Sequence, residues 1–252
     1  MGANYAHQVT YSLDVVFCID STMSMQYMIG QVTQNALHFY DDLARKMEEM
    51  GKCVDKVRVR IISFRDYNHD MDRSMESTRF FELPEEKENF ERAMKSITVF
   101  GGGDDAESSL EALSYAIRSD WRATTDRYRQ VIVLWTDDEP HPLHDISYQR
   151  NIYSSMPDND PARYYPSDEL PRDLSELCDW WEDPDLGYID QTGKRLLLFS
   201  PLRIEGRSDV REAYAWGEIR DWSNVIHRNV SSTGSLQELD YNVIIETLIK
   251  SV

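Results

Sequence analysis

Apolar residues along this chain fall into two patterns that alternate with one another. Short apolar runs at 15–19, 131–135 and 196–199 are typical of strands buried on both faces of a parallel sheet. Between them lie segments whose apolar residues recur every three or four positions, which is typical of amphipathic helices. The longest such segment covers 25–50 and stops at Gly51, a residue suited to the left-handed cap of a helix.

The remaining segments complete an order of strand, helix, strand, helix. In the strand predicted at 56–67, Val57 and Val59 alternate with Arg58 and Arg60, which indicates one partly solvated face. A short edge strand is predicted at 79–85 and a further strand at 223–230. Helices are predicted at 85–97, 106–117, 170–182, 210–222 and 236–248. This order predicts a doubly wound α/β fold, Rossmann-like, with a mostly parallel sheet, helices on both faces and one short antiparallel edge strand.

Composition restricts the class of protein. The 252 residues suffice for one domain covering 1–252, and 41% hydrophobic residues allow a sizeable core. The net charge of −18 argues against nucleic acid or an anionic membrane as partner. Three cysteines without paired spacing, no membrane-length apolar run and no recognisable leader favour a cytoplasmic protein.

Negative charge is concentrated in one region, an acidic excursion at about 138–192. Between residues 137 and 190 there are 15 Asp or Glu and three Arg, a net −12 of the chain's −18. This span is much longer than an ordinary connection between a strand and a helix. It either shapes a binding surface or is only a solvated acidic cover, and we expect the domain to fold without most of 145–190.

Candidate chemistry lies where two buried strands end. Asp20, Thr22 and Ser24 follow the run at 15–19, and Asp137 follows the run at 131–135. The carboxyl ends of parallel strands share one edge of a sheet, where ligands bind if the strand order reverses. Carboxylate and hydroxyl oxygens are ligands that Mg²⁺ accepts. The pattern therefore predicts a divalent metal site at this edge.

Three segments together resemble the von Willebrand factor A-type domain of intracellular bacterial proteins. The family's DxSxS loop is similar to the segment with Asp20, Thr22 and Ser24, and its TDG to Thr136 and the two aspartates after it. The GGGDDAE segment looks like the GGGDxxE variant, in which Asp104 stands where the family places a metal-binding threonine. The resemblance implies a metal-ion-dependent adhesion site with Mg²⁺ or Mn²⁺ on Asp20, Thr22, Ser24, Asp104 and Asp137.

Such domains bind protein partners rather than catalyse, and the intracellular ones often act in multi-protein stress or defence assemblies. Asp104 as a third carboxylate leaves local charge near −1 around the ion, which disfavours an acidic ligand. Either Asp104 is a helix cap, in a capping box with Glu107, or the site takes a different surface, such as one bearing Lys or Arg.

Two other functions stay open. Asp20 beside a magnesium ion could act as the nucleophile of a phosphoryl-transfer hydrolase, although Thr22 stands where dehalogenase-type phosphatases place a second aspartate. The chain could also be a scaffold whose metal site is unused. His141 and His144 follow Asp137 closely enough to suggest a second metal or a base, but histidines in a proline-rich loop are usually structural.

Overall fold

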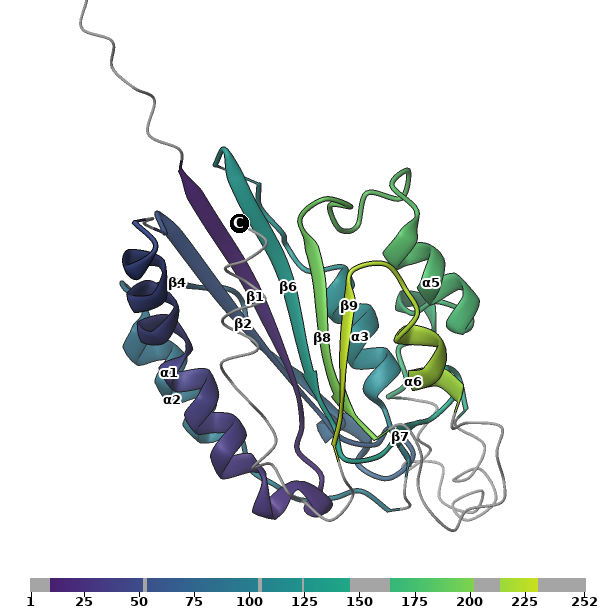
Figure 1. Ribbon diagram of the computed structural model, residues 1–252. Coiled ribbons are helices and arrows are strands. Elements are labelled where there is room, and N and C mark those ends of the chain that lie inside the picture. Colours follow the sequence, from purple (N-terminus) through teal and green to yellow (C-terminus); the bar gives the residue numbers. More distant parts are fainter. Residues whose placement is uncertain are drawn as a thin grey trace, which may run out of the picture.

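A central sheet with helices on both faces forms the body of the molecule (Figure 1). The structure is a computed structural model that describes residues 10–51, 54–103, 106–123, 125–145, 164–201 and 214–230. The helix predicted at 236–248, Cys53, Asp104 and part of the acidic excursion lie outside the described residues.

Five parallel strands build most of the sheet, as predicted. In sequence order they are β1 (Tyr11–Asp20), β2 (Lys56–Phe64), β6 (Arg127–Trp135), β8 (Lys194–Ser200) and β9 (Val225–Asn229). Their spatial order is β2-β1-β6-β8-β9. Two short strands, β3 (Met75–Ser77) and β4 (Phe81–Leu83), pair antiparallel with β2. The sequence predicted β4 and missed β3, whose three residues are too few to show a periodic pattern.

Helices cover the two faces of the sheet in separate layers (Figure 1). One face carries α1 (Ile29–Glu49) and α2 (Lys87–Ser96). The other carries α3 (Ser109–Ile117), α5 (Leu174–Glu182) and α6 (Tyr214–Ile219). Short 3₁₀ helices occur at Met23–Tyr27 (η1), Met71–Arg73 (η2) and Ser167–Glu169 (η5). The helix predicted from residue 25 thus begins at Ile29, after η1.

Alternation along the strands produces a core on each face. Phe17 packs edge-on against Phe39 of α1, with ring centroids 5.6 Å apart. Val16 and Cys18, which point the other way, lie in the core beneath α3 and α5. Both faces of the sheet are therefore buried, which explains the unbroken apolar runs of β1, β6 and β8.

The interpretation of β2 as partly solvated is wrong for Arg58. Its side chain is only 7% exposed and forms a buried ion pair with Asp14 of β1. The alternation that indicated a wet face instead marks a basic residue whose partner lies on the neighbouring strand.

The described part of the acidic excursion contributes to the core, so it is more than a solvated cover. Leu177 and Trp181 of α5 are fully buried, and the Trp181 indole donates to the Ser223 carbonyl oxygen at 2.8 Å. The buried Lys194 ammonium of β8 lies 2.9 Å from the Glu182 carboxylate. Removing 145–190 would remove Leu177 and Trp181 from the core on this face of the sheet, so we now expect the deletion to destabilise the domain. None of the described helices is long and apolar enough to cross a membrane.

Candidate metal centre

The predicted site residues lie at the carboxyl ends of β1 and β6, which are adjacent and parallel. After β1 the chain adds β2 on one side of that strand and later β6 on its other side. The strand order therefore reverses between β1 and β6. Such a switch point leaves a crevice between the loops that follow the two strands. Asp20 ends β1, and Thr136 and Asp137 follow β6 directly.

Asp20 is the buried centre of this arrangement, with no exposed surface. Its Oδ1 accepts hydrogen bonds from the Thr22 hydroxyl at 2.6 Å and the Thr22 backbone N–H at 2.9 Å. Its Oδ2 accepts from the Thr136 hydroxyl at 2.9 Å. The carboxylate is thus fixed in one orientation by neutral donors from both strand ends.

A chain of hydroxyls connects Asp20 to the second carboxylate. Thr22 Oγ1 lies 3.0 Å from Ser24 Oγ, and Ser24 donates to Asp137 Oδ1 at 2.9 Å. Ser24 is exposed, whereas Thr22 is buried. The four side chains therefore form one connected set of oxygens that reaches from the interior to the surface.

The glycine-rich loop closes a third side of the site. Gly102 adopts a φ of +72°, and a side chain there would approach Thr22 Cβ to 3.3 Å and Glu107 Oε1 to 3.0 Å. The Gly102 N–H donates to Asp70 Oδ2 at 3.0 Å, and the Gly101 carbonyl accepts from the Met23 N–H at 3.3 Å. Only glycine satisfies both the left-handed conformation and the close approach to Thr22.

Just before these glycines, Phe100 is held between two cations. The Arg65 and Arg73 guanidinium carbons lie 3.8 Å and 3.7 Å from its ring centroid, so the two groups must occupy opposite faces. Arg65 has no exposed surface and also donates to the Thr98 carbonyl oxygen at 2.9 Å. This packing fixes the approach of the glycine-rich loop to the site.

Negative charge at the site has no direct ion-pair partner among the described residues. Burial raises the pKa of the Asp20 carboxyl to about 7, and the Asp137 carboxylate adds to the rise. Burial likewise raises the pKa of Asp137, and that of Asp138 to about 7. No lysine or arginine in the described part of the chain forms an ion pair with Asp20 or Asp137.

The donor set fits a hard divalent cation such as Mg²⁺ or Mn²⁺. Two carboxylates and two hydroxyls are linked in a row, each within hydrogen-bond distance of the next, and oxygen is the ligand atom these ions prefer. Over the described ranges, no group of three or more His, Cys, Asp or Glu could hold a metal on its own. An ion here would therefore depend on the hydroxyls and on water. Asp104, the fifth predicted ligand, lies outside the described residues.

The capping-box interpretation of Asp104 and Glu107 is wrong, because α3 begins only at Ser109 with Ser108 as its N-cap. Glu107 instead belongs to a two-residue strand, β5 (Ala106–Glu107), paired in parallel with β7 (Glu139–Pro140). Since β7 follows directly after Asp138, this pairing ties the glycine-rich segment to the Asp137 loop.

The histidines after Asp137 contact other parts of the protein. The His144 ring Nε2 is 2.9 Å from the Pro171 carbonyl oxygen, and the His144 backbone N–H donates to the Tyr165 hydroxyl at 2.7 Å. His141 is buried, with Nε2 3.6 Å from Asp66 Oδ1. Cys18 is fully buried, which raises the pKa of its thiol and removes it as a nucleophile.

Two residues that shape the site were not among the predicted site residues. Thr136 holds Asp20, and Asp70 receives a backbone N–H from the glycine-rich loop. Thr136 was named in the TDG-like motif, but no role was assigned to it. Asp70 has no comparable signal, since it reaches the loop across 32 positions of sequence.

Comparison with known proteins identifies the family. A family model for the von Willebrand factor A domain matches residues 14–142, which is half of the chain. The chain belongs to the von Willebrand factor A domain family. The match runs from β1 to just beyond β7 and so includes Asp20, Thr22, Ser24 and Asp137. No curated protein matches the sequence of this domain.

Solved structures share the fold at low identity. The von Willebrand domain of the type V pili tip protein Mfa5 from Porphyromonas gingivalis has a TM-score of 0.52 and 12% identity, covering 98% of this chain and 97% of that one. The pilus adhesin SpaC from Lactobacillus rhamnosus GG has a TM-score of 0.55 and 11% identity over 95% of this chain. The chain spans 31% of SpaC. These neighbours establish a von Willebrand factor A fold.

Proposed function

We propose that this domain binds a protein partner through a divalent cation held at the carboxyl edge of its sheet. The observation that carries the proposal is the connected oxygen set of Asp20, Thr22, Ser24 and Asp137, whose two carboxyl groups form no ion pair with any lysine or arginine that the structure describes. Mg²⁺ or Mn²⁺ would lie against these oxygens, with Asp104 retained as a candidate fifth ligand. The bound ion supplies a Lewis-acidic position for an oxygen of the partner.

The geometry favours binding over phosphoryl transfer. A nucleophilic carboxylate must present an oxygen to its substrate, whereas both Asp20 oxygens accept hydrogen bonds inside the protein and the residue has no exposed surface. Ser24 and Asp137 are the members of the set nearest to solvent. A partner would therefore meet the ion from the side of those two residues, and we propose a non-enzymatic role.

The setting of this function is also a proposal. We infer a cytoplasmic domain that works inside a multi-protein assembly, with neither nucleic acid nor membrane as partner. The net charge of −18 supports that choice because both of those surfaces are anionic.

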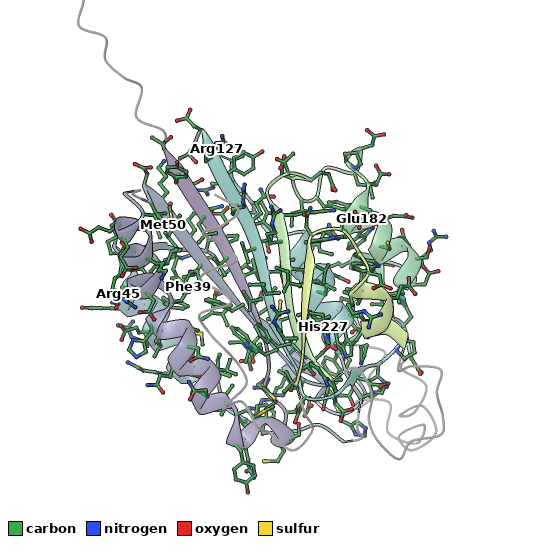
Figure 2. All side chains as sticks on the ribbon, viewed as in Figure 1. Phe39, Arg45, Met50, Arg127, Glu182 and His227 are labelled. Atoms are coloured by element: carbon green, nitrogen blue, oxygen red, sulfur yellow. The ribbon has the colours of Figure 1, made fainter. Side chains whose placement is uncertain are left out.

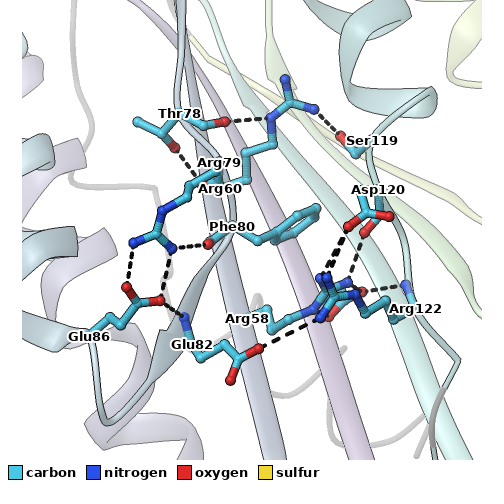
Figure 3. Close-up of polar contacts among 11 residues, drawn as sticks. Arg58, Arg60, Thr78, Arg79, Phe80, Glu82, Glu86, Ser119, Asp120 and Arg122 are labelled. Atoms are coloured by element: carbon cyan, nitrogen blue, oxygen red, sulfur yellow. Dashed lines mark hydrogen bonds and ion pairs between the residues drawn. The ribbon is translucent and has the colours of Figure 1, made fainter.

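Asp20→Ala tests the proposal, with Asp120→Ala as matched control. The Asp120 side chain is 76% exposed and lies near Arg58 and Arg122 (Figure 3). Arg58 pairs with Asp14 near the start of β1, whereas Asp20 lies at the other end of that strand. We expect the wild type and Asp120→Ala to bind one Mg²⁺ or Mn²⁺ ion in calorimetry, and Asp20→Ala to bind none. Partner capture should follow the same order and be lost in EDTA.

Either of two results would replace the proposed function with a different one. Hydrolysis of p-nitrophenyl phosphate by the wild type, abolished by Asp20→Ala, would make the domain a hydrolase. Capture of the same partner in EDTA and by Asp20→Ala would make it a scaffold with an unused site.

A further inference from the structure

Three arginines gather on one face of the sheet, at the amino ends of β6 and β8. Arg127 and Arg129 are two positions apart on β6, so both side chains point to the face that carries α1 and α2. Val131, the next residue on that face, is paired in register with Arg195 of β8. Arg195 is therefore the diagonal neighbour of Arg129 on the same face.

This arginine cluster (Arg127, Arg129 and Arg195) has no carboxylate partner in the part of the chain that the structure describes. Arg45 of α1, by comparison, pairs with both Asp42 and Glu49. Acidic residues outnumber basic ones by 45 to 27 in this chain, so a shortage of carboxylates does not explain the difference.

The carboxylate of Asp190 acts on Arg129 only from beyond ion-pair distance. Its Oδ1 already accepts hydrogen bonds from the backbone N–H groups of Thr192 and Gly193, at 2.9 Å and 2.7 Å. The Thr192 hydroxyl donates to the same oxygen at 2.7 Å. Asp190 therefore stabilises the turn before β8 rather than the arginine cluster.

Backbone carbonyl groups orient two of the three guanidinium groups. Arg129 Nη1 donates to the Tyr128 carbonyl oxygen at 2.8 Å, and Arg195 Nη1 donates to the Lys194 carbonyl oxygen at 2.5 Å. The Nη2 groups of both arginines have no acceptor among the described residues, nor does the buried Nε of Arg129. Since a guanidinium carries five N–H donors, each of the two is held in place while donors remain unused.

The charges of the cluster repel one another. Burial lowers the pKa of the Arg129 guanidinium, and the charges of Arg195 and Arg127 lower it further. Burial also lowers the pKa of Arg195. An anion between the three groups would relieve this repulsion. Arg127 is exposed and the other two are half-buried, so an anion can reach them from solvent.

A phosphate group fits the cluster better than a carboxylate does. Residues two positions apart on a strand are about 7 Å apart, and adjacent strands are about 4.8 Å apart, so three long side chains can converge on one group. A phosphate monoester carries about −1.5 to −2 charges and three acceptor oxygens, one for each guanidinium. A carboxylate carries one charge and two oxygens. The net charge of −18 disfavours nucleic acid, which favours an isolated phosphate group.

We propose that Arg127, Arg129 and Arg195 form a binding site for one phosphate group, either the free ion or a monoester on a larger ligand. The site lies at the amino end of the sheet, whereas the proposed metal centre lies at the carboxyl end. The inference therefore goes beyond the proposed function and does not depend on it.

Titration calorimetry at low ionic strength tests the site, with protein freed of divalent ions so that phosphate cannot bind through a metal. The probes are inorganic phosphate and phenyl phosphate, which is a monoester. We expect saturable binding of one phosphate per chain to the wild type. Arg127→Gln and Arg195→Gln should each weaken binding about ten-fold or more, the effect of losing a charge-assisted hydrogen bond.

Arg45→Gln is the matched control. Figure 2 shows Arg45 on α1 and Arg127 at the amino end of β6, and both are exposed. Arg45 already has carboxylate partners, so we expect Arg45→Gln to bind both probes within about two-fold of wild type. Replacing the exposed Arg127 should not disturb folding, and urea denaturation of each variant checks this.

The relative affinity of the two probes identifies the source of the phosphate. Phenyl phosphate binding at least as tightly as inorganic phosphate would support the site with a monoester ligand, and tighter binding of inorganic phosphate would support it with the free ion. No saturable binding, or binding unchanged in both Arg127→Gln and Arg195→Gln, would overturn the site. Benzoate binding as tightly as phenyl phosphate, or a single-stranded oligonucleotide binding more tightly, would overturn its selectivity for an isolated phosphate group.

Discussion

Strand β1 carries a buried aspartate near each end, and the molecule surrounds the two carboxylates differently. Asp14, near the start of β1, is 3% exposed and receives the Arg58 guanidinium on both oxygens, with Nε 2.8 Å from Oδ1. The backbone N–H of Arg122 also donates to the Asp14 carboxylate, at 2.8 Å. Asp20, at the other end, receives only hydroxyls and one backbone N–H.

The contrast extends to the surroundings of each group. Figure 3 shows Arg58 among Phe80, Asp120 and Arg122; its guanidinium donates to the Asp120 carbonyl oxygen at 2.9 Å and lies 4.4 Å from the Phe80 ring centroid. The charge of Asp14 is thus neutralised by the chain. In the described part of the chain no guanidinium or ammonium pairs with Asp20 at the carboxyl end, and this difference distinguishes the surroundings of the two buried aspartates.

Removing the cation at the amino end should have the largest effect. Arg58→Met leaves Asp14 buried without its partner and should lower the free energy of unfolding by about 3–5 kcal/mol, measured by urea denaturation. The double variant Arg58→Met/Asp14→Leu should recover much of that loss, because no charge is then buried. A single-variant loss below about 1 kcal/mol would mean that water reaches Asp14 after all.

Removing charge at the carboxyl end should have the opposite sign. The raised pKa of Asp20 means that the folded protein holds a proton the unfolded chain releases, so stability falls as pH rises from about 4 through about 7. In EDTA at pH 8, Asp20→Asn should be more stable than wild type by about 2–4 kcal/mol.

The matched substitution at the other end of β1 is the control for Asp20→Asn. Asp14→Asn should destabilise the protein, since it leaves the buried Arg58 without its counter-ion. Saturating Mg²⁺ should raise the melting temperature of the wild type and of Asp14→Asn but not that of Asp20→Asn. A lower stability of Asp20→Asn in EDTA would contradict a centre that lacks its own cation.

The same contrast explains what sequence reasoning reached and what it missed. The strands that end at Asp20 and Asp137 could be predicted, because buried parallel strands leave unbroken apolar runs and their carboxyl ends meet. Asp14 interrupts one such run, and its partner Arg58 lies 44 positions away on a strand whose alternation resembles a solvated face. The period of a pattern indicates on which face of a strand a residue lies, but not which side chain of a neighbouring strand pairs with it.

Tertiary packing, rather than composition, also determines which residues of the acidic excursion are buried. Its composition is that of a solvated segment, yet Leu177 and Trp181 are fully buried against the sheet. The sequence predicted the helix at 170–182, but the surrounding charge gave no indication that Leu177, Trp180 and Trp181 are buried.

A smaller effect is expected at Glu111 of α3, a buried carboxyl away from both aspartates of β1. Burial raises its pKa to about 7, and the hydrogen bond from the Tyr165 hydroxyl, at 2.7 Å, lowers it in part. The folded state therefore holds a proton between about pH 4.5 and 7, and stability is lost as pH rises through that window.

Glu111→Gln should flatten the pH dependence of the free energy of unfolding by about 1–3 kcal/mol between pH 5 and 8, measured by urea denaturation at each pH. It should leave the Mg²⁺-dependent rise in melting temperature unchanged, because Glu111 is not among the proposed ligands. An unaltered pH profile would show that the Glu111 carboxylate is neutralised in the folded protein.

The smallest effect is expected at Arg79 and Glu86, an exposed ion pair close to the buried one (Figure 3). The Arg79 guanidinium contacts both Glu86 oxygens, as Arg58 does with Asp14, and its hydrogen bonds lower the pKa of Glu86 to about 2. The Arg79 side chain is 63% exposed, however, so water and salt replace most of what the pair provides. Arg79→Ala should therefore leave the urea midpoint within experimental error of wild type, and added NaCl should remove any residual difference. A loss comparable to that of Arg58→Met would show that contact geometry rather than burial sets the strength of these pairs, and Asp14 would then no longer be distinguished by its desolvated surroundings.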